Sequence, residues 1–406
     1  MRAYHFTEEP YPDAWKLDTD TLRVTYPNSL CDPVRAADLY HQYLDGWQLC
    51  DELGLDIFVN EHHSTTTCLT ASCNVILSIL ARITKRARLL GLGFPIAVRS
   101  DPVRLAEEMS MIDVISRGRL DMGFIKGVPF EYHPSNTNAV HMASRFAEAQ
   151  DLILKAMTTH DGPFSWEGEH FQYRNVNIWP RPYQQPHPPV WNSCLSPSSV
   201  AAVAKRGYVM GTIFAGYLTK NLFEVYRKVW AESGHPGSAP LDRLAYSGFV
   251  ACGETEAEGL RRGDILTSYF KTNAIVAEPY KNPPGYIPAA AGARMIKQTG
   301  TMAFHGYDVL DRDGKPIAPF AKADARTMIA GGLMYAGTPD QVYNQIVDFY
   351  DHVGGFGNLL MMCHAGNMSY ADTQSSLTLF ATEVLPRLKD YAKARAKQTG
   401  QLEAVA

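Results

Sequence analysis

Four polar residues, Asn60, Glu61, His62 and His63, directly follow the apolar segment LDIFV. Because side chains alternate along a strand, His62 is expected to point away from Glu61 and His63. An imidazole titrates near neutral pH, so His62 is a candidate proton donor or base. The alternative is a structural histidine held by hydrogen bonds. A metal centre would need further ligands, and no second cluster of His, Asp or Glu is obvious, so we predict none.

Two further segments carry residues that suit an anion. Lys126 and Gly127 follow the segment RLDMGF, where the cation can meet an anion and the glycine lets backbone approach it. Ser196 and Ser199 follow the segment VWNS and open a helix, whose free N–H groups suit a phosphate. A solvated lysine and an ordinary helix cap are the alternatives for these residues. Arg145 lies within a helix and fits a surface ion pair as well as a ligand.

These candidate residues need a scaffold, which we predict from an alternation of short apolar segments with amphipathic ones. Asp32 and Asp101, each followed by proline, and Thr338 in a Thr-Pro-Asp-Gln capping box predict helix starts. The segments predicted as strands are RAYHF, LDIFVN, ARLLGLGFPI, RLDMGF, VWNS, YVMGTIF, LAYSGFVAC and NLLMMC. About eight strand–helix units close a (β/α)₈ TIM barrel, whose reactive groups lie at the C-terminal ends of the strands. A doubly wound sheet is the alternative, but GLGF lacks the third glycine of a dinucleotide fingerprint.

The pattern predicts a single domain over residues 1–395, with insertions at about 160–189 and 272–335 and a tail at 396–406. In the first insertion, FSWEGEHFQYRNVNIW is typical of a β-hairpin turning near Glu167, and PRPYQQPHPP cannot be helical. The second insertion is too long for an ordinary connection, and we expect it to cover one end of the barrel.

The composition excludes several classes of protein. The 406 residues carry a formal net charge of -4 without a Lys/Arg-rich run, which argues against nucleic acid or an anionic membrane as partner. We find no signal peptide and no apolar run long enough to span a bilayer. The seven scattered cysteines suit reduced thiols, so we expect a cytoplasmic location.

The order and spacing of these segments resemble the luciferase-like flavin-dependent monooxygenases, the family of the bacterial luciferase subunits and the alkanesulfonate monooxygenases. The resemblance covers most of the chain and is sharpest in VNEHH, DPVRLAEEMSMIDVISRGRLDMGF, SRFAEAQDLI, NIWPRPYQQPHPPVW and GTPDQV. It implies a TIM barrel with insertions, often dimeric, that binds FMN at the C-terminal mouth. It also implies that reduced FMN comes from a separate reductase and reacts with oxygen to give a C4a-(hydro)peroxide.

The resemblance assigns roles to individual residues. His62, with Glu61 beside it, matches the histidine that works next to the flavin, and Tyr132 lies in a loop that could line the substrate pocket. Gly93-Phe94 falls where the family can carry a non-prolyl cis peptide under the flavin ring. The positions that hold the FMN phosphate are occupied by Lys126, Arg145, Ser196 and Ser199.

Two departures from bacterial luciferase affect these implications. Luciferase has an arginine where this chain has Lys126, and a lysine neutralises phosphate only as a point charge. Luciferase also has a reactive cysteine at the position of Ile125, which argues against luciferase proper but not against oxygenation.

We therefore predict an FMNH₂-dependent monooxygenase that oxidises a small organic substrate with O₂. A flavin reductase and further copies of the chain, as a homodimer or homotetramer, are the expected partners. One alternative is hydride transfer with the deazaflavin F420 on the same fold. Another is a catalytically silent flavin-binding protein, because a fold does not guarantee activity.

Overall fold

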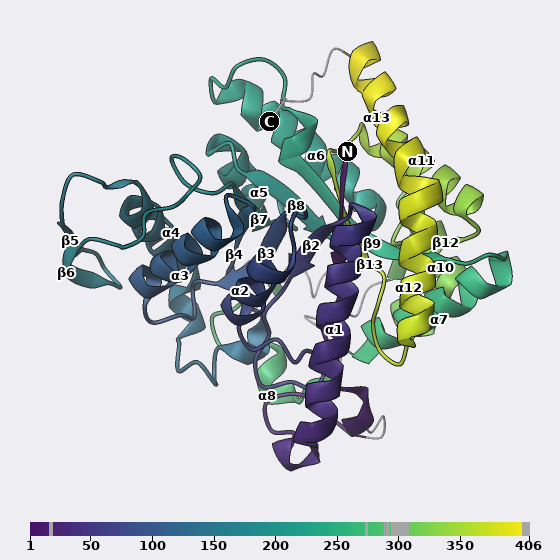
Figure 1. Ribbon diagram of the computed structural model, residues 1–406, viewed down its shortest axis with the longest axis horizontal. Coiled ribbons are helices and arrows are strands. Elements are labelled where there is room, and N and C mark those ends of the chain that lie inside the picture. The colour runs from purple at the N-terminus through teal and green to yellow at the C-terminus, as the bar shows by residue number, and fades with distance from the viewer. Residues whose placement is uncertain (16–18, 273–274, 288, 290–291, 294–307, 400–406) are drawn as a thin grey trace.

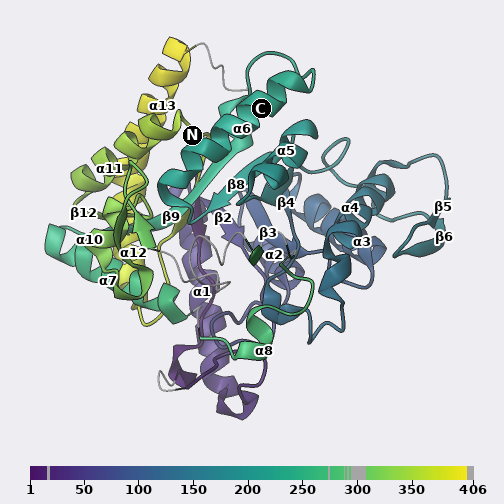
Figure 2. The same ribbon diagram turned by 180° about the vertical axis from the view of Figure 1, so that it is seen from behind.

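The computed structural model of the chain describes residues 1–15, 19–272, 275–287, 289, 292–293 and 308–399. Its centre is a closed barrel of eight parallel strands surrounded by helices (Figures 1 and 2). In chain order the barrel strands are β1 (Arg2–Phe6), β2 (Asp56–Val59), β3 (Leu89–Pro95), β4 (Leu120–Ile125), β7 (Val190–Ser193), β8 (Val209–Ile213), β9 (Leu244–Cys252) and β13 (Asn358–Met362). They coincide with the eight apolar segments predicted from the sequence, so the predicted TIM barrel is confirmed.

The helices that cover the barrel start where the sequence predicted. Asp32 caps the first helix by accepting a bond from the Val34 N–H at 2.9 Å, and Asp101 and Thr338 cap their helices in the same way. The long helices are α1 (Pro33–Leu53), α2 (Cys73–Ile83), α3 (Pro102–Ser116), α4 (Met142–Thr158), α5 (Pro197–Lys205), α6 (Thr219–Glu232), α7 (Glu256–Thr272), α11 (Pro339–Val353), α12 (Tyr370–Leu379) and α13 (Leu385–Thr399). A π-helical turn, Phe380–Val384, joins the last two. Helix α13 ends at Thr399, four residues beyond the domain end predicted at 395. The rest of the predicted tail, 400–406, lies outside the described residues.

The two predicted insertions contain structure of their own. The first holds the predicted antiparallel hairpin of β5 (Phe164–Glu167) and β6 (Gln172–Val176). The second contributes α8 (Glu278–Lys281), the antiparallel pair β10 (Asp308–Leu310) and β11 (Pro316–Pro319), and α10 (Ala325–Ala330). Residues 273–274, 288, 290–291 and 294–307 of this insertion lie outside the described part of the chain.

Three strands of the described chain were not predicted: the pair β10 and β11 in the second insertion, and β12 beside the barrel. Strand β12 (Met334–Gly337) runs parallel to the C-terminal half of β9, and Met334 pairs with Phe249. It begins within the segment that the sequence analysis treated as irregular. The residues MYAG are too few to show a period, which is why the pattern gave no signal.

The core has two layers, and alternation along the strands assigns each side chain to one of them. On β2, Ile57 and Val59 pack outward against the helices, whereas Phe58 packs inside the barrel with Leu92 and Trp191. Strands of a parallel barrel are buried on both faces, which explains their nearly continuous apolar sequence.

Two features bear on the environment of the protein. Within the described residues, no helix combines the length and hydrophobicity that crossing a bilayer requires. All seven cysteines are free thiols.

Candidate active site

His62 lies at the mouth of the barrel between two carboxylates. Its Nδ1 is 3.0 Å from Oε1 of Glu131, and its Nε2 is 4.0 Å from Oε1 of Glu8. The imidazole is mostly buried, with 16% of the side chain exposed, and the Glu131 side chain is fully buried. Nδ1 is thus fixed by Glu131, whereas Nε2 has only the longer contact with Glu8.

The same contacts determine the charge of His62. Burial alone would lower the pKa of the imidazole, but the hydrogen bond and charge of Glu131, with the charge of Glu8, raise it above its usual 6.5. Burial likewise favours a neutral Glu131, yet its bonds with His62 and the Val128 N–H lower the pKa of this carboxyl. The pair therefore keeps the histidine protonated to a higher pH than a free imidazole, and a protonated imidazole can act as a proton donor.

Glu61, predicted to assist His62, points to the opposite side of the strand. Both of its oxygens accept bonds from Arg99 at 2.7 Å, and Oε1 lies 3.1 Å from Nε2 of His63. Its Oε2 also accepts the N–H of Cys73 at 2.8 Å, at the start of α2. Glu61 thus ties the end of β2 to the start of α2 and to the loop after β3.

Sequence reasoning missed the carboxylates that contact His62. Glu8 lies two residues after β1, so the rule that selected the end of β2 would also have selected it. Its Oε2 accepts a hydrogen bond from the hydroxyl of Tyr269. Nearby, the buried guanidinium of Arg23 lies 4.3 Å from the ring centre of Phe130 and donates to Thr65 at 3.1 Å. Glu131 lies in the loop after β4 and carried no local signal.

The predicted phosphate ligands Lys126, Ser196 and Ser199 are brought together at the ends of the paired strands β4 and β7. The Ser196 side chain accepts from the Ser199 N–H at 3.3 Å, and the two hydroxyls are 3.0 Å apart, forming a capping box at the start of α5. Burial raises the pKa of the neighbouring Cys194 thiol to about 12, although the positive charge of Lys126 acts to lower it. Lys126 itself is exposed, and no described residue pairs with its ammonium group. A free cation beside a helix N-terminus can hold an anion.

Arg145 is engaged with backbone on one side of its guanidinium. Its Nε and Nη2 donate at 3.0 Å to the carbonyls of Ala97 and Arg99, in the loop after β3. The guanidinium also lies 4.7 Å from the ring centre of Phe171. Arg145 therefore fixes the loop that carries Arg99, the partner of Glu61, and neither bonded nitrogen is free for phosphate.

The non-prolyl cis peptide joins Leu92 to Gly93, one bond earlier than the Gly93-Phe94 position that the resemblance implied. A Cβ at Gly93 would lie 2.7 Å from the carbonyl oxygen of Gly123, so the close approach of β3 and β4 requires a glycine. The Phe94 ring lies in the outer core between barrel and helices, so it does not face the mouth.

Tyr132, expected in a loop that could line the substrate pocket, is buried and supports the Lys126 loop. Its hydroxyl donates to the carbonyl of Lys126 at 2.5 Å, and its ring packs edge-on against Tyr286 with centres 5.6 Å apart. Tyr286 donates in turn to the carbonyl of Gly127 at 3.1 Å. The two tyrosines thus fix the backbone that presents the lysine.

Three buried polar side chains line the inside of the barrel without a partner among the described residues: Asn60, Trp191 and Ser247. Asn60 lies between Val59 and Glu61, which both point outward, so alternation directs its amide inward. Buried polar atoms are normally hydrogen-bonded, and groups without a protein partner indicate a ligand or ordered water. Together with the unpaired Lys126, they fit a ligand that has a polar ring system and a phosphate.

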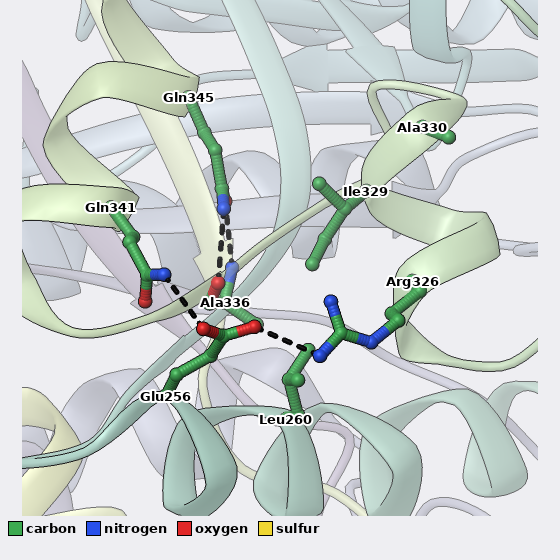
Figure 3. A pocket seen from close by; sticks show the side chains of 8 residues that line it. All are labelled: Glu256, Leu260, Arg326, Ile329, Ala330, Ala336, Gln341 and Gln345. Atoms are coloured by element: carbon green, nitrogen blue, oxygen red, sulfur yellow. Dashed lines mark hydrogen bonds and ion pairs between the residues drawn. The ribbon is translucent and has the colours of Figure 1, made fainter.

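Two hollows lie outside the barrel mouth. One of about 260 Å³ lies outside the barrel between α7, α10 and α11 (Figure 3). There Glu256 pairs with Arg326 at 2.8 Å and accepts from Gln341 at 3.1 Å, while Gln345 pairs with the backbone of Ala336. Its polar lining groups are thus already paired with one another. The other hollow, of about 370 Å³, lies between α1 and the loop after β13.

The fold is a closed parallel barrel whose mouth carries a histidine between two carboxylates and an exposed lysine near a helix N-terminus. Residues 27–355 match the sequence model of the family described as luciferase-like monooxygenase. Because this match covers most of the chain, the protein belongs to that family.

Curated relatives support this membership. The chain is 32% identical over 191 residues to the uncharacterized protein y4wF of Sinorhizobium fredii, covering 46% of this chain and 55% of that one. It is 30% identical over 171 residues to the oxygenase component of the flavin-dependent trigonelline monooxygenase of Acinetobacter baylyi, covering 42% and 47%. The matches thus span about half the length of these two relatives. The alkanal monooxygenase alpha chain of Photobacterium leiognathi matches at 23% identity over 352 residues, covering 84% and 91%.

Solved structures share the fold. The oxygenating constituent of 3,6-diketocamphane monooxygenase from Pseudomonas putida, in complex with FMN, superposes with a TM-score of 0.68 at 19% identity, covering 95% of this chain and 98% of that one. The coenzyme F420 dependent tetrahydromethanopterin reductase of Methanopyrus kandleri superposes with a TM-score of 0.63 at 14% identity, covering 95% and 98%. At these identities the likeness concerns the fold alone.

Proposed function

We propose that the protein is an FMNH₂-dependent monooxygenase that uses O₂ to oxidise a small organic substrate. The observation that carries the proposal is the pairing of two features in one mouth. A histidine whose protonated form is favoured by a contact with Glu131 at 3.0 Å lies at the end of β2, and an unpaired lysine lies near the N-terminus of α5. The family membership and the FMN complex of a fold neighbour support the choice of cofactor.

In this proposal Lys126, Ser196 and Ser199 hold the phosphate, and the unpartnered polar groups of Asn60 and Trp191 face the ring. Reduced FMN, when bound, would supply the activation of oxygen, which the side chains cannot perform. Glu131 accepts the Nδ1 proton of His62 and fixes the ring, so the proton that is transferred is the one on Nε2. The apolar inner wall, including Phe58 and Leu92, excludes water from the reacting atoms.

The proposal includes partners and a location. A separate flavin reductase is inferred because one relative is named an oxygenase component. A second copy of the chain is proposed as a structural partner, through apolar side chains exposed on α2 and α3. The free thiols accord with a reducing, cytoplasmic setting.

The test measures how the protein changes the reaction of reduced FMN with oxygen. Protein in excess is mixed with anaerobic FMNH₂ and then with aerated buffer, and the return of the oxidised-flavin absorbance is followed by stopped flow. We expect a slower return than in the protein-free control, and a faster return with His62→Ala, although this variant should still bind FMN. Reoxidation at the protein-free rate would contradict the proposal, and binding of FMN without any change in rate would indicate a silent flavin-binding protein.

Hydride transfer with F420 is the second candidate, because an F420-dependent enzyme shares the fold and the same anchor could hold its phosphate. Oxygen uptake separates the two functions. Consumption of reduced F420 without oxygen uptake, in the absence of any effect on FMNH₂, would establish the second candidate and contradict the first.

A further inference from the structure

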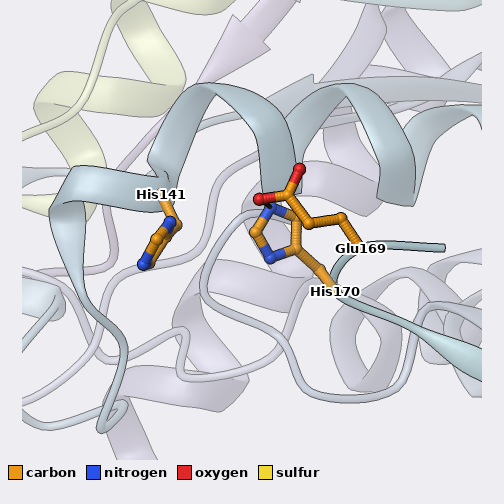
Figure 4. Close-up of side chains that lie close together, drawn as sticks. All are labelled: His141, Glu169 and His170. Carbon is orange, nitrogen blue, oxygen red and sulfur yellow. Dashed lines mark ion pairs between the residues drawn. The ribbon is translucent and has the colours of Figure 1, made fainter.

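Outside the barrel mouth, His141, Glu169 and His170 bring three metal-ligating side chains together (Figure 4). One ligand atom from each lies within 4.8 Å of the others. Four ligands around Zn²⁺ at about 2.0–2.2 Å are separated by roughly 3.3 Å. Side-chain rotations alone can close the difference, because His141 and Glu169 are exposed.

From this geometry we infer that His141, Glu169 and His170 form a binding site for a divalent transition metal, best suited to Zn²⁺. Two imidazoles and a carboxylate are the donor set that zinc prefers, whereas Mg²⁺ and Ca²⁺ prefer oxygen ligands. Three protein ligands leave the fourth position to water. The site is distinct from the proposed flavin site and revises the sequence-based prediction that there is no metal.

The surrounding residues hold one ligand in place before any metal binds. Only 9% of the His170 side chain is exposed, and its Nε2 lies 2.7 Å from the Ser144 hydroxyl and 3.6 Å from Oε1 of Glu169. Glu148 accepts from the backbone N–H of His170 at 2.9 Å and from the indole N–H of Trp166 at 3.0 Å. Glu148 thus fixes the backbone that carries His170. The Ser144 hydroxyl lies against Nε2 itself, so a metal bound at that nitrogen would replace it.

The position of the site suggests its effect. His141, Ser144 and Glu148 lie on one face of the α4 region, and the other two ligands lie in the turn of the β5–β6 hairpin. A bound ion would therefore link the hairpin to α4. Because the Phe171 ring lies 4.7 Å from the Arg145 guanidinium, the ion would also stiffen the neighbourhood of the loop after β3.

Isothermal titration of the untagged full-length chain with ZnCl₂ tests the inference. We expect one Zn²⁺ per chain, and an affinity at least about tenfold weaker in His141→Ala and in Glu169→Gln. The exposed His160, outside the cluster, supplies the matched control, and His160→Ala should bind as the parent does. Circular dichroism of each variant confirms that the fold is retained.

Two results would overturn the site. One is unchanged Zn²⁺ affinity in both His141→Ala and Glu169→Gln, which would place the ion elsewhere. The other is equal affinity for Mg²⁺, which would exclude imidazole donors. A second readout is thermal unfolding: Zn²⁺ should raise the midpoint of the wild type and of His160→Ala, but not that of His141→Ala.

Discussion

At the scale of single residues, the charge on His62 depends on Glu131, whose Oε1 also accepts the His63 backbone N–H at 3.2 Å. Glu131→Gln keeps an acceptor oxygen at this point but removes the negative charge. We therefore expect the pKa of His62 to fall, because burial then outweighs the remaining charge of Glu8. NMR titration of the His62 ring measures this pKa, and Glu167→Gln, at an exposed position, is the control. An unchanged pKa of His62 in Glu131→Gln would show that Glu131 does not set its protonation.

The same pair predicts how stability depends on pH. The raised pKa of His62 contributes stability that is fully present below 6.5 and lost as pH rises through the folded value. The lowered pKa of Glu131 contributes stability above 4.5 that is lost as pH falls through its folded value. At pH 6, Glu131→Gln should therefore reduce the free energy of unfolding by about 1–3 kcal/mol. Urea unfolding from pH 5 to 9 checks this, since the deficit should shrink at the alkaline end.

Glu9 predicts that the stability of the wild type falls as pH rises. Burial raises the pKa of its carboxyl from 4.5 to about 8, and its Oε2 has no partner among the described residues. Between these two pH values, Glu9 is ionised in the unfolded chain and protonated in the folded chain. The free energy of unfolding of the wild type therefore falls by about 1.4 kcal/mol for each unit by which the pH rises. Glu9→Gln cannot ionise, and its stability relative to the wild type should rise from pH 5 to pH 8. If the difference in the free energy of unfolding between the two proteins stays constant over this pH range, Glu9 is ionised in the folded protein.

At the scale of elements, the junction of β4 and α5 makes a prediction about the cofactor. Lys126→Ala removes the one unpaired cation at this junction in the described part of the chain, and Ser196→Ala removes the cap that orients the helix N-terminus. A charge-assisted hydrogen bond contributes about 1.5–3 kcal/mol, so each change should weaken FMN binding roughly tenfold or more. Riboflavin lacks the phosphate and should bind both variants as it binds the wild type, as judged by fluorescence quenching. A parallel loss of both flavins would contradict the anchor.

How far the sequence predicts the site depends on where each partner lies in the chain. His62 and Lys126 were found because both follow apolar strands of recognisable pattern. The structural role of Glu61 was not predictable, because its partner Arg99 comes from the loop after the next strand. Glu131 and Glu8 likewise meet His62 only when β1, β2, β3 and β4 pair in the sheet. Local spacing thus identifies strand ends, whereas the pairing across those ends is a property of the closed barrel.

At the scale of the whole molecule, the described residues expose an apolar surface on two neighbouring helices. The α2–α3 face consists of six side chains, each at least 36% exposed, on two helices that pack side by side (Figure 1): Val75, Ile79, Ile83, Met111, Val114 and Ile115. Exposed apolar patches of this kind mark interfaces, and a two-fold axis would bury the same face of both copies.

We expect the wild type to sediment at twice the 45.1 kDa chain mass or a multiple of it, in keeping with a homodimer or homotetramer. Ile79→Glu introduces a charge that would be buried at the centre of the α2–α3 face, and burying an unpaired charge is costly enough to dissociate the assembly. Ile317→Glu, at a similarly exposed apolar position on β11, is the control that should leave the mass unchanged. A monomeric wild type in analytical ultracentrifugation would refute the interface. If Ile79→Glu remains oligomeric, the interface lies on another surface. If Ile79→Glu dissociates and Ile317→Glu does not, the α2–α3 face forms the contact between copies.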